Sequence, residues 1–308
     1  MMKKLSENAV SKFTQIGPIT NVFFNLIMLV LVVMCIVPLL LVVAISFSAE
    51  KSLQLYGYQL IPKIFSFEGY AFLLQNKETM LRTLYMSVVV TGIGTSLGII
   101  LNSLMGYVLS RREYKLNRFL IWFIFIPMIF GGGLVSSYFI NSQFLGLKDS
   151  VWVLILPMAV GSFNVILCKT FFRTTIPDSI IESAVIDGAS QIVIYFRIIL
   201  PLSLPVLATV GLFLSFAYWN DWFLAMLYID NIKLFTLQAY LNRLLGDINF
   251  LAQNAQTMGL NYAAIIATMP KESARMAMVV LAVLPIACAY PFFQRYFISG
   301  LTIGAIKG

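Results

Sequence analysis

The sequence contains no histidine among its 308 residues, and only 11% of them are charged. Without histidine the chain cannot build imidazole metal sites or Ser-His-Asp and Cys-His nucleophile systems, and it lacks the usual general base near neutral pH. Soluble domains carry about a quarter charged residues, so a chain this poor in charge could not cover a water-facing surface. Since 60% of the residues are hydrophobic and the mean hydropathy is +0.89, lipid is expected to be the solvent for much of the chain.

Cysteine is scarce as well, and a phosphate-binding loop is missing. The cysteines stand alone in apolar stretches with no CxxC pair, which predicts buried thiols rather than a disulfide framework: Cys35, Cys168 and Cys288. No Gly-x-x-x-x-Gly-Lys-Ser/Thr sequence occurs, the loop that cradles nucleotide phosphates in P-loop ATPases. If ATP drives a process in which this chain takes part, the nucleotide must bind a different polypeptide.

Long apolar stretches are abundant. A membrane-crossing helix needs about 20 mostly apolar residues, and an open sheet cannot satisfy its backbone in hydrocarbon. We therefore predict an all-α integral membrane protein with six spans, at roughly 21–47, 84–110, 118–141, 151–171, 202–229 and 277–297. The first stretch is too long for a signal-peptide core and no A-x-A site follows it, so it is expected to remain as an anchor. The chain then divides into an N-terminal segment (1–20), a six-span domain (21–297) and a C-terminal tail (298–308).

Small or polar residues recur every three or four positions within the second stretch. Gly94 and Gly98, with Ser87, Thr91 and Asn102 around them, form a small-xxx-small pattern. A nucleotide-binding glycine turn has similar spacing but needs a preceding strand, which is missing here. The pattern therefore predicts a close helix–helix contact.

Basic residues are concentrated in short loops. Residues 111–118 hold four of them against Glu113, residues 169–201 hold three, and three lysines precede the first span. By the positive-inside rule, the net charge of +8 then reflects membrane topology rather than nucleic-acid binding, and both termini are expected in the cytoplasm. The segments 48–80 and 230–276 would lie outside, where each runs along the membrane surface, contacts a soluble partner or simply connects two spans.

Two motifs are candidates for a transport pathway. Gly132 and Gly133 follow Pro127 in the third span, and such a break is tolerated where protein or a water-filled cavity satisfies the backbone; a packing kink is the alternative. Asp221 is the only acid that falls clearly inside a predicted span, and buried charges usually face a cavity or a partner. With Trp219 and Asn220 beside it, the site suits a sugar, whose C–H faces stack on aromatic rings; an interfacial aromatic belt is the alternative.

The loop between the fourth and fifth spans is too elaborate for a simple hairpin. Pro177 suits a helix start, and Ser179 with Glu182 matches a capping box. Gly188 offers a tight turn that a residue with a β-carbon would resist. The apolar residues expected to share one helix face are Ile181, Ala184, Val185 and Ile192. The segment 177–201 is therefore predicted to form a short amphipathic helix, a turn and a second short helix, presented to a partner protein; an inert interfacial helix would not need the glycine.

This segment resembles the EAA motif of ABC importer permeases, EAA-x3-G-x9-I-x-LP. Every spacing is kept, and the one departure is Ser183 for the second alanine. The matching positions are Glu182, Ala184, Gly188, Ile198, Leu200 and Pro201, flanked by Asp187 and Ala189. The run 285–308 looks like a Gram-positive subgroup that handles complex oligosaccharides, and the resemblance covers nearly the whole chain.

The resemblance implies a type I ABC importer permease fold in a bacterial plasma membrane, with six spans and a cytoplasmic coupling helix. It implies that this chain forms half of a heterodimeric pore with a second homologous permease. Two cytoplasmic ATPase subunits would dock on the segment 177–201, and an extracellular solute-binding protein would deliver an oligosaccharide. ATP and magnesium would bind the ATPase, so this chain is expected to carry no cofactor and to perform no covalent chemistry. Glu182 would accept bonds from a basic ATPase residue, Gly188 would permit the bend, and the tail at 304–308 would reach the ATPase pair.

Two other classes are the alternatives. A secondary transporter driven by an ion gradient would show internal repeats and several intramembrane carboxylates, whereas only Asp221 lies within a span. An integral membrane enzyme would show a cluster of polar catalytic residues. Neither class accounts for the EAA spacing.

Overall fold

Helices are the main element of the computed structural model, which describes residues 17–111, 113–254 and 270–305. Extended structure in these ranges amounts to one isolated antiparallel bridge between Ser48 and Phe65. The all-α prediction is confirmed. Most of the predicted N-terminal segment (1–20) and the end of the predicted tail (298–308) lie outside the described residues, as does Arg112 of the basic loop.

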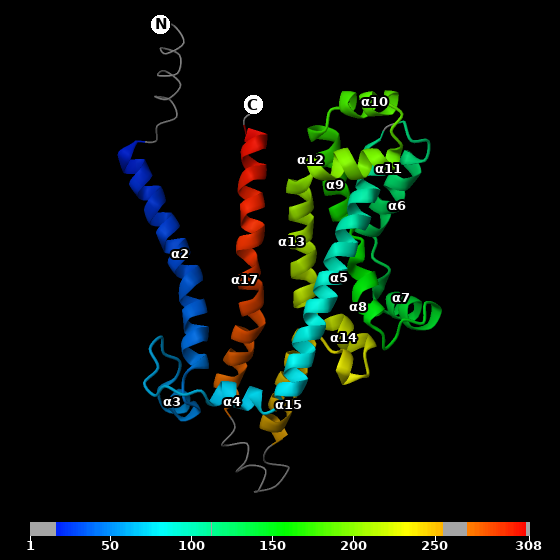
Figure 1. The fold of residues 1–308 in the computed structure, drawn as a ribbon. Helices are drawn as coiled ribbons and strands as arrows, with labels where there is room; N and C mark the ends of the chain where they lie inside the picture. Colours follow the sequence, from blue (N-terminus) through cyan, green and yellow to red (C-terminus); the bar gives the residue numbers. More distant parts are fainter. Residues whose placement is uncertain (1–16, 112, 255–269, 306–308) are drawn as a thin grey trace. The chain divides into compact units, whose positions relative to one another are not determined.

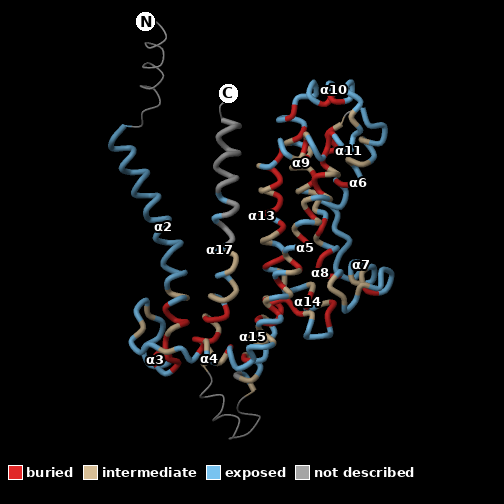
Figure 2. Tube along the Cα trace, viewed as in Figure 1, coloured by how far each residue is buried: buried red, intermediate tan, exposed pale blue. Residues whose placement is uncertain are grey.

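The chain divides into two compact units. The first comprises residues 1–72 and 269–280. Its helices are α2 (Pro18–Ser46), α3 (Glu50–Tyr56), most of α4 (Glu68–Leu74) and the beginning of α17 (Lys271–Ala305). Large apolar side chains are exposed along α2 as far as Val43, and burial begins only at Ala44 (Figure 2). A helix with this surface needs lipid or another protein around it.

The second unit comprises residues 73–268 and 281–308. Its long helices are α5 (Lys77–Ser110), α6 (Asn117–Ile129), α9 (Ser162–Thr175), α13 (Leu204–Asn220) and α15 (Leu237–Asn254). Shorter pieces connect them: α7 (Gly133–Phe139), the π-helix η1 (Ile140–Phe144), α8 (Val151–Ala159), α10 (Asp178–Ile186), α11 (Gln191–Ile194), the π-helix η2 (Tyr195–Ile199), α12 (Leu200–Leu202), α14 (Phe223–Tyr228) and the 3₁₀ turn η3 (Ile232–Leu234). Figure 1 shows α8, α9 and α13 alongside α5.

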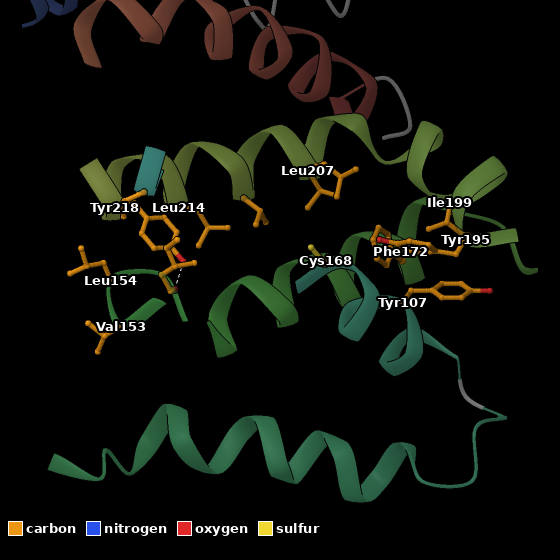
Figure 3. Close-up of a cluster of buried hydrophobic side chains, with 14 of the residues drawn as sticks. Tyr107, Val153, Leu154, Cys168, Phe172, Tyr195, Ile199, Leu207, Leu214 and Tyr218 are labelled. Carbon is orange, nitrogen blue, oxygen red and sulfur yellow. Dashed lines mark hydrogen bonds between the residues drawn. The ribbon is translucent and has the colours of Figure 1, made fainter. Parts of the chain in front are cut away.

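Close packing around α5 organises the core of the second unit. A β-carbon added at Gly94 would lie 2.5 Å from the ring of Tyr218 on α13, and one at Gly98 would lie 2.7 Å from Leu214. The helix–helix contact predicted from the small residues is therefore confirmed. Figure 3 shows the buried cluster that this approach permits, in which Phe172, Tyr195 and other side chains of α5, α8, α9 and α13 interlock.

Three of the predicted spans are bent rather than straight. Among the described helices, α2 and α5 are long and apolar enough to cross a membrane alone, and three bent pairs raise the number to five. The bends are 119° between α6 and the α7–η1 pair, 47° between α8 and α9, and 82° between the α11–α12 stretch and α13. The stretches predicted as single helices at 118–141 and 151–171 are thus corrected. The stretch 202–229 is corrected as well, because α13 ends at Asn220 and α14 begins only at Phe223. The sixth predicted span lies within the continuous helix α17, where several side chains fall outside the description.

The break between α8 and α9 is closed by a side chain of α5. Asn102 is fully buried. Its Nδ2 donates to the carbonyl oxygen of Ala159 at 2.8 Å, and its Oδ1 accepts from the backbone nitrogen of Gly161 at 3.0 Å. A broken membrane helix frees backbone groups that need such partners, so Asn102 stabilises the bend.

The cysteines are free thiols with different surroundings. Cys168 is fully buried against Gly106 of α5, but Cys35 and Cys288 are exposed. The prediction of buried thiols is therefore wrong for these two. An apolar sequence neighbourhood does not distinguish the core of the protein from its lipid-facing surface.

Candidate functional site

The helix α10 lies across the end of the second unit, at a steep angle to α5 and α13 (Figure 1). Residues before proline avoid the helical region, so Ile176 (φ −100°, ψ 113°) follows the end of α9. Pro177 then occupies the N-cap position and α10 begins at Asp178. The predicted capping box is wrong, because Ser179 lies inside the first turn and not before it. Asp178 in the first turn is favourable beside the positive end of the helix dipole.

The helix α10 has one buried face and one exposed face. Ile181 and Ala184 are buried, whereas Val185 and Ile186 are exposed, as is Glu182. Val185 and Ile192 were predicted on the buried face and are 49% and 70% exposed. The exposed face therefore combines a carboxylate with large aliphatic side chains, which is the chemistry of a protein-binding surface.

Gly188 ends α10 in a Schellman motif. Its φ is +80°, its N–H donates to the carbonyl of Val185 at 3.0 Å, and the N–H of Ala189 donates to the carbonyl of Ala184 at 2.9 Å. This pair of bonds defines the motif, which places a left-handed residue directly after the helix. The predicted turn is confirmed. The glycine is needed for its backbone angle, because a β-carbon built there would find no atom within 4 Å.

Two polar side chains of α5, and the side chain of Arg111 at its C-cap, hold the segment 177–201. Ser103 Oγ and Tyr195 Oη are 2.7 Å apart, and Tyr107 Oη donates to Gln191 Oε1 at 2.7 Å. Arg111 Nη1 lies 3.1 Å from the carboxylate of Asp178. We did not predict these α5 contacts. A signal exists for two of them, because Ser103 and Tyr107 are spaced by four and therefore share one helix face.

The two buried tyrosines strengthen this attachment. The rings of Tyr107 and Tyr195 lie 5.7 Å apart, within the range of favourable aromatic pairs. Both rings also belong to the buried hydrophobic cluster, so η2 is attached to α5 by apolar packing as well as by hydrogen bonds.

An open hollow of about 920 Å³ lies between α10 and the end of α5. Its charged lining is mixed: Arg111, Arg173, Glu113, Asp178 and Glu182. Apolar side chains of α10 also line it. No group of three or more cysteine, aspartate or glutamate side chains that could hold a metal ion occurs in the ranges that the structure describes.

The last part of the motif forms an irregular helix that enters the core. Ile198 and Leu200 pack against the buried cluster, and Tyr195–Ile199 is a π-helix. Pro201 lies in α12, before the 82° bend at Ser203, and α13 begins at Leu204. The bend of 82° therefore separates the end of the motif from the long helix α13.

The pathway candidates lie at two helix breaks. Gly132 and Gly133 are exposed at the start of α7, where Gly133 has φ +80°. Trp219 is buried and its Nε1 donates to the carbonyl of Ala282 at 2.9 Å. Asn220 is exposed. Asp221 follows the last residue of α13, and its carboxylate accepts from the backbone nitrogen of Leu224 at 3.3 Å. The contacts seen for the Asp221 carboxylate thus shape the break, and its contact with a substrate stays a prediction.

Comparison with known proteins places these features in context. No protein-family model matches the sequence. The chain is 35% identical over 281 residues to the polygalacturonan/rhamnogalacturonan transport system permease protein YtcP of Bacillus subtilis, which covers 91% of this chain and 96% of that protein. Protein LplC of the same organism is 37% identical over 89% of this chain and 90% of its own length. The melibiose/raffinose/stachyose import permease protein MelC, also from Bacillus subtilis, is 30% identical over 72% of this chain and 74% of its own.

A solved structure shows the same fold. A chain of a bacterial ABC transporter involved in the import of the acidic polysaccharide alginate superimposes with a TM-score of 0.78. It is 25% identical in sequence, and the match covers 92% of this chain and 99% of that one.

Proposed function

This chain belongs to the permease subunits of ABC carbohydrate importers, and we propose that it forms one half of a membrane pore that admits an oligosaccharide to the cell. Two of its relatives are named for the transport of polygalacturonan/rhamnogalacturonan and for the import of melibiose, raffinose and stachyose. The structural match belongs to an importer of the acidic polysaccharide alginate. Multiple apolar helices in the described ranges agree with a multi-pass membrane protein.

The proposed assembly contains a second homologous permease, two ATPase subunits and an extracellular solute-binding protein. The dense basic loop at 111–118 supports an orientation with both termini and α10 in the cytoplasm. ATP and magnesium would bind the ATPase, since this chain contains no phosphate-binding loop. The chain itself would be non-catalytic and would bind no cofactor.

The exposed face of α10 is the observation that carries this proposal. Glu182 is exposed on that face, where its carboxylate can accept charge-assisted hydrogen bonds from a basic residue of the ATPase. Ser183 and Asp187 extend the contact surface, while Ala184, Gly188 and Ala189 form the cap that ends the helix. Residues of the last part of the motif, Ile198, Leu200 and Pro201, would transmit movement into α13.

Substrate contacts are proposed at the helix breaks. The exposed amide of Asn220 and the partly exposed Asp221 could hydrogen-bond sugar hydroxyls, beside the ring of Trp219. Gly132 and Gly133 expose backbone groups in a similar break. Both breaks would line a water-filled cavity, the setting in which irregular backbone is tolerated at membrane depth.

The test removes the charge of Glu182 without changing its shape. We expect Glu182→Gln to lower both ATPase co-purification and sugar uptake, and Glu182→Lys to lower them further through repulsion. The matched control is Glu78→Gln, which neutralises another exposed carboxylate, on the first turn of α5. Normal uptake and normal co-purification in both Glu182 variants would show that α10 is not the ATPase contact.

A further inference from the structure

Large apolar side chains are exposed on the segment 58–67 of the first unit. Each of six aromatic or aliphatic residues there is more than half exposed: Tyr58, Leu60, Ile61, Ile64, Phe65 and Phe67. We call these six residues the outer apolar patch. A water-facing surface rarely carries so many exposed large apolar side chains in one short segment, so another phase or molecule is expected to cover them.

The patch is attached firmly to the end of α2. The backbone nitrogen of Ser66 donates to the carbonyl of Phe47 at 2.9 Å. The ring of Phe47 stacks on Phe65 with centroids 5.4 Å apart, and meets Phe67 edge-on at 5.6 Å. These contacts fix the patch to the residue that follows α2. The depth of the patch along the membrane normal therefore follows the depth of the C-terminal end of α2.

The N-terminal end of α17 lies beside the C-terminal end of α2. The carboxylate of Glu50 is buried and accepts from the backbone nitrogens of Glu272 and Ser273 at 3.2 Å. The C-terminal end of α2 and the N-terminal end of α17 therefore lie together within this unit. Each helix leads into a predicted span, at 21–47 and 277–297, so their meeting point is where the chain leaves the membrane.

Helix length gives the depth of this point. At about 1.5 Å per residue, the 29 residues of α2 extend about 43 Å. A bilayer has a hydrocarbon core of about 30 Å and a total thickness of about 40–45 Å with its headgroups. The end of α2, and with it the outer apolar patch, is thus expected among the headgroups.

The charges around the patch suit an anionic lipid surface. Glu50 is buried, whereas Lys51 and Lys63 are exposed, with Glu68 as the one exposed acid between residues 47 and 68. The carboxylate of Glu272 on α17 is already engaged by the patch, because it accepts from Tyr58 Oη at 2.8 Å. Lys63 lies with its Nζ 3.8 Å from the ring centroid of Tyr56. Aromatic side chains with lysines are enriched at membrane interfaces, where the lysine attracts lipid phosphate.

From this geometry we infer that the outer apolar patch inserts into the headgroup layer of the outer leaflet and binds anionic phospholipid. This contact would hold the joined ends of α2 and α17 at constant depth while other parts of the transporter move. The inference rests on the proposed membrane location of the chain and not on the proposed coupling site at 177–201.

A fluorescent label at the centre of the patch tests the inference. The full-length chain, with its co-purifying partners, is reconstituted in nanodiscs of phosphatidylglycerol and phosphatidylethanolamine, after Cys35→Ala and Cys288→Ala remove the exposed thiols. Ile61→Cys, at a side chain 82% exposed, carries the environment-sensitive dye NBD. Asn231→Cys, at an exposed position of the other outer segment, is the control.

We expect the label at 61 to emit at shorter wavelength than the label at 231 and to lose intensity with doxyl-labelled lipid. Equal quenching of both labels by aqueous iodide would overturn the inference, because the patch would face water. Resistance to both quenchers would overturn it as well, because a protein would then cover the patch.

The lipid charge is tested separately in the same discs. Replacing phosphatidylglycerol by phosphatidylcholine should reduce the doxyl quenching at 61, and Lys51→Gln with Lys63→Gln should remove this dependence on lipid charge. Quenching that does not change with lipid charge in the parent chain would refute the preference for anionic lipid.

Discussion

Replacing Gly188 by alanine should damage coupling through the backbone alone. Gly188 has φ +80° at the end of α10, and no atom lies within 4 Å of a β-carbon built there. The left-handed conformation costs an L-residue about 1–2 kcal/mol, and no steric clash adds to this cost. Since a difference of 1–2 kcal/mol changes an equilibrium about 5- to 30-fold, the capped form of α10 should become that much less favourable.

The expected result is a graded series. Gly188→Ala should lower ATPase co-purification and the ATP hydrolysis stimulated by the solute-binding protein, because the exposed face of α10 is no longer held in one position. Gly188→Asn should recover part of both, since asparagine tolerates the left-handed region better than alanine does. Global thermal stability should change little, because the strain is confined to one turn.

A matched control separates this reasoning from general damage. Gly246 lies within α15, has no positive φ and also has open space around a built β-carbon. Gly246→Ala should leave both readouts unchanged or stabilise the protein slightly, because alanine is a better helix former than glycine by about 1 kcal/mol. If Gly188→Ala behaves like Gly246→Ala, or if asparagine is no better than alanine, the Schellman turn does not position the coupling helix.

Three further predictions concern α5. Tyr195→Phe removes the hydroxyl bond to Ser103, worth about 0.5–1.5 kcal/mol, and should lower the amount of sugar imported per ATP hydrolysed while the assembly stays intact. Tyr85→Phe, on an exposed tyrosine of α5, should leave this ratio unchanged, and equal ratios in the two variants would argue against the tether. Asn102→Leu leaves two buried backbone groups at the α8–α9 break without their partner, at a cost of about 1–3 kcal/mol each. It should lower the midpoint of thermal unfolding in detergent, and an unchanged midpoint would mean that the bend needs no side-chain partner. Gly94→Ala places a methyl group 2.5 Å from the ring of Tyr218 and should cost about 1–3 kcal/mol as overpacking, measured by the same midpoint; a neutral result would show that α13 can move away.

Hydropathy and motif spacing predicted most of the architecture. The apolar stretches identified α2, α5 and α17 because a straight span and a run of apolar residues coincide there. The EAA spacing predicted the turn at Gly188, where the chain adopts a left-handed conformation just past the C-cap residue Asp187. Small residues at Gly94 and Gly98 predicted the tight contact of α5, because close helix packing needs residues without side-chain bulk.

The breaks within the spans could not be predicted in the same way. A hydropathy window averages over Val160 and Gly161 and therefore reads α8 and α9 as one helix, although the two cross at 47°. The partner that makes the break possible is Asn102, which lies nearly sixty positions earlier in the chain. The capping box at Ser179 failed for a local reason: Pro177 supplied an earlier helix start that excluded it.

One helix connects these findings. Along α5, the face with Gly98 and Asn102 closes the α8–α9 break, and the face with Ser103 and Tyr107 binds the segment that follows α10. A force that passes from α10 through the turn at Gly188 to α11 and η2 must therefore either break these two short hydrogen bonds or move α5. Because α5 packs against α13 through Gly94 without spare volume, its displacement must shift the helix that ends at Asn220. On the proposed function, this is the physical route by which an event at Glu182 reaches the helix break where the sugar is expected to bind.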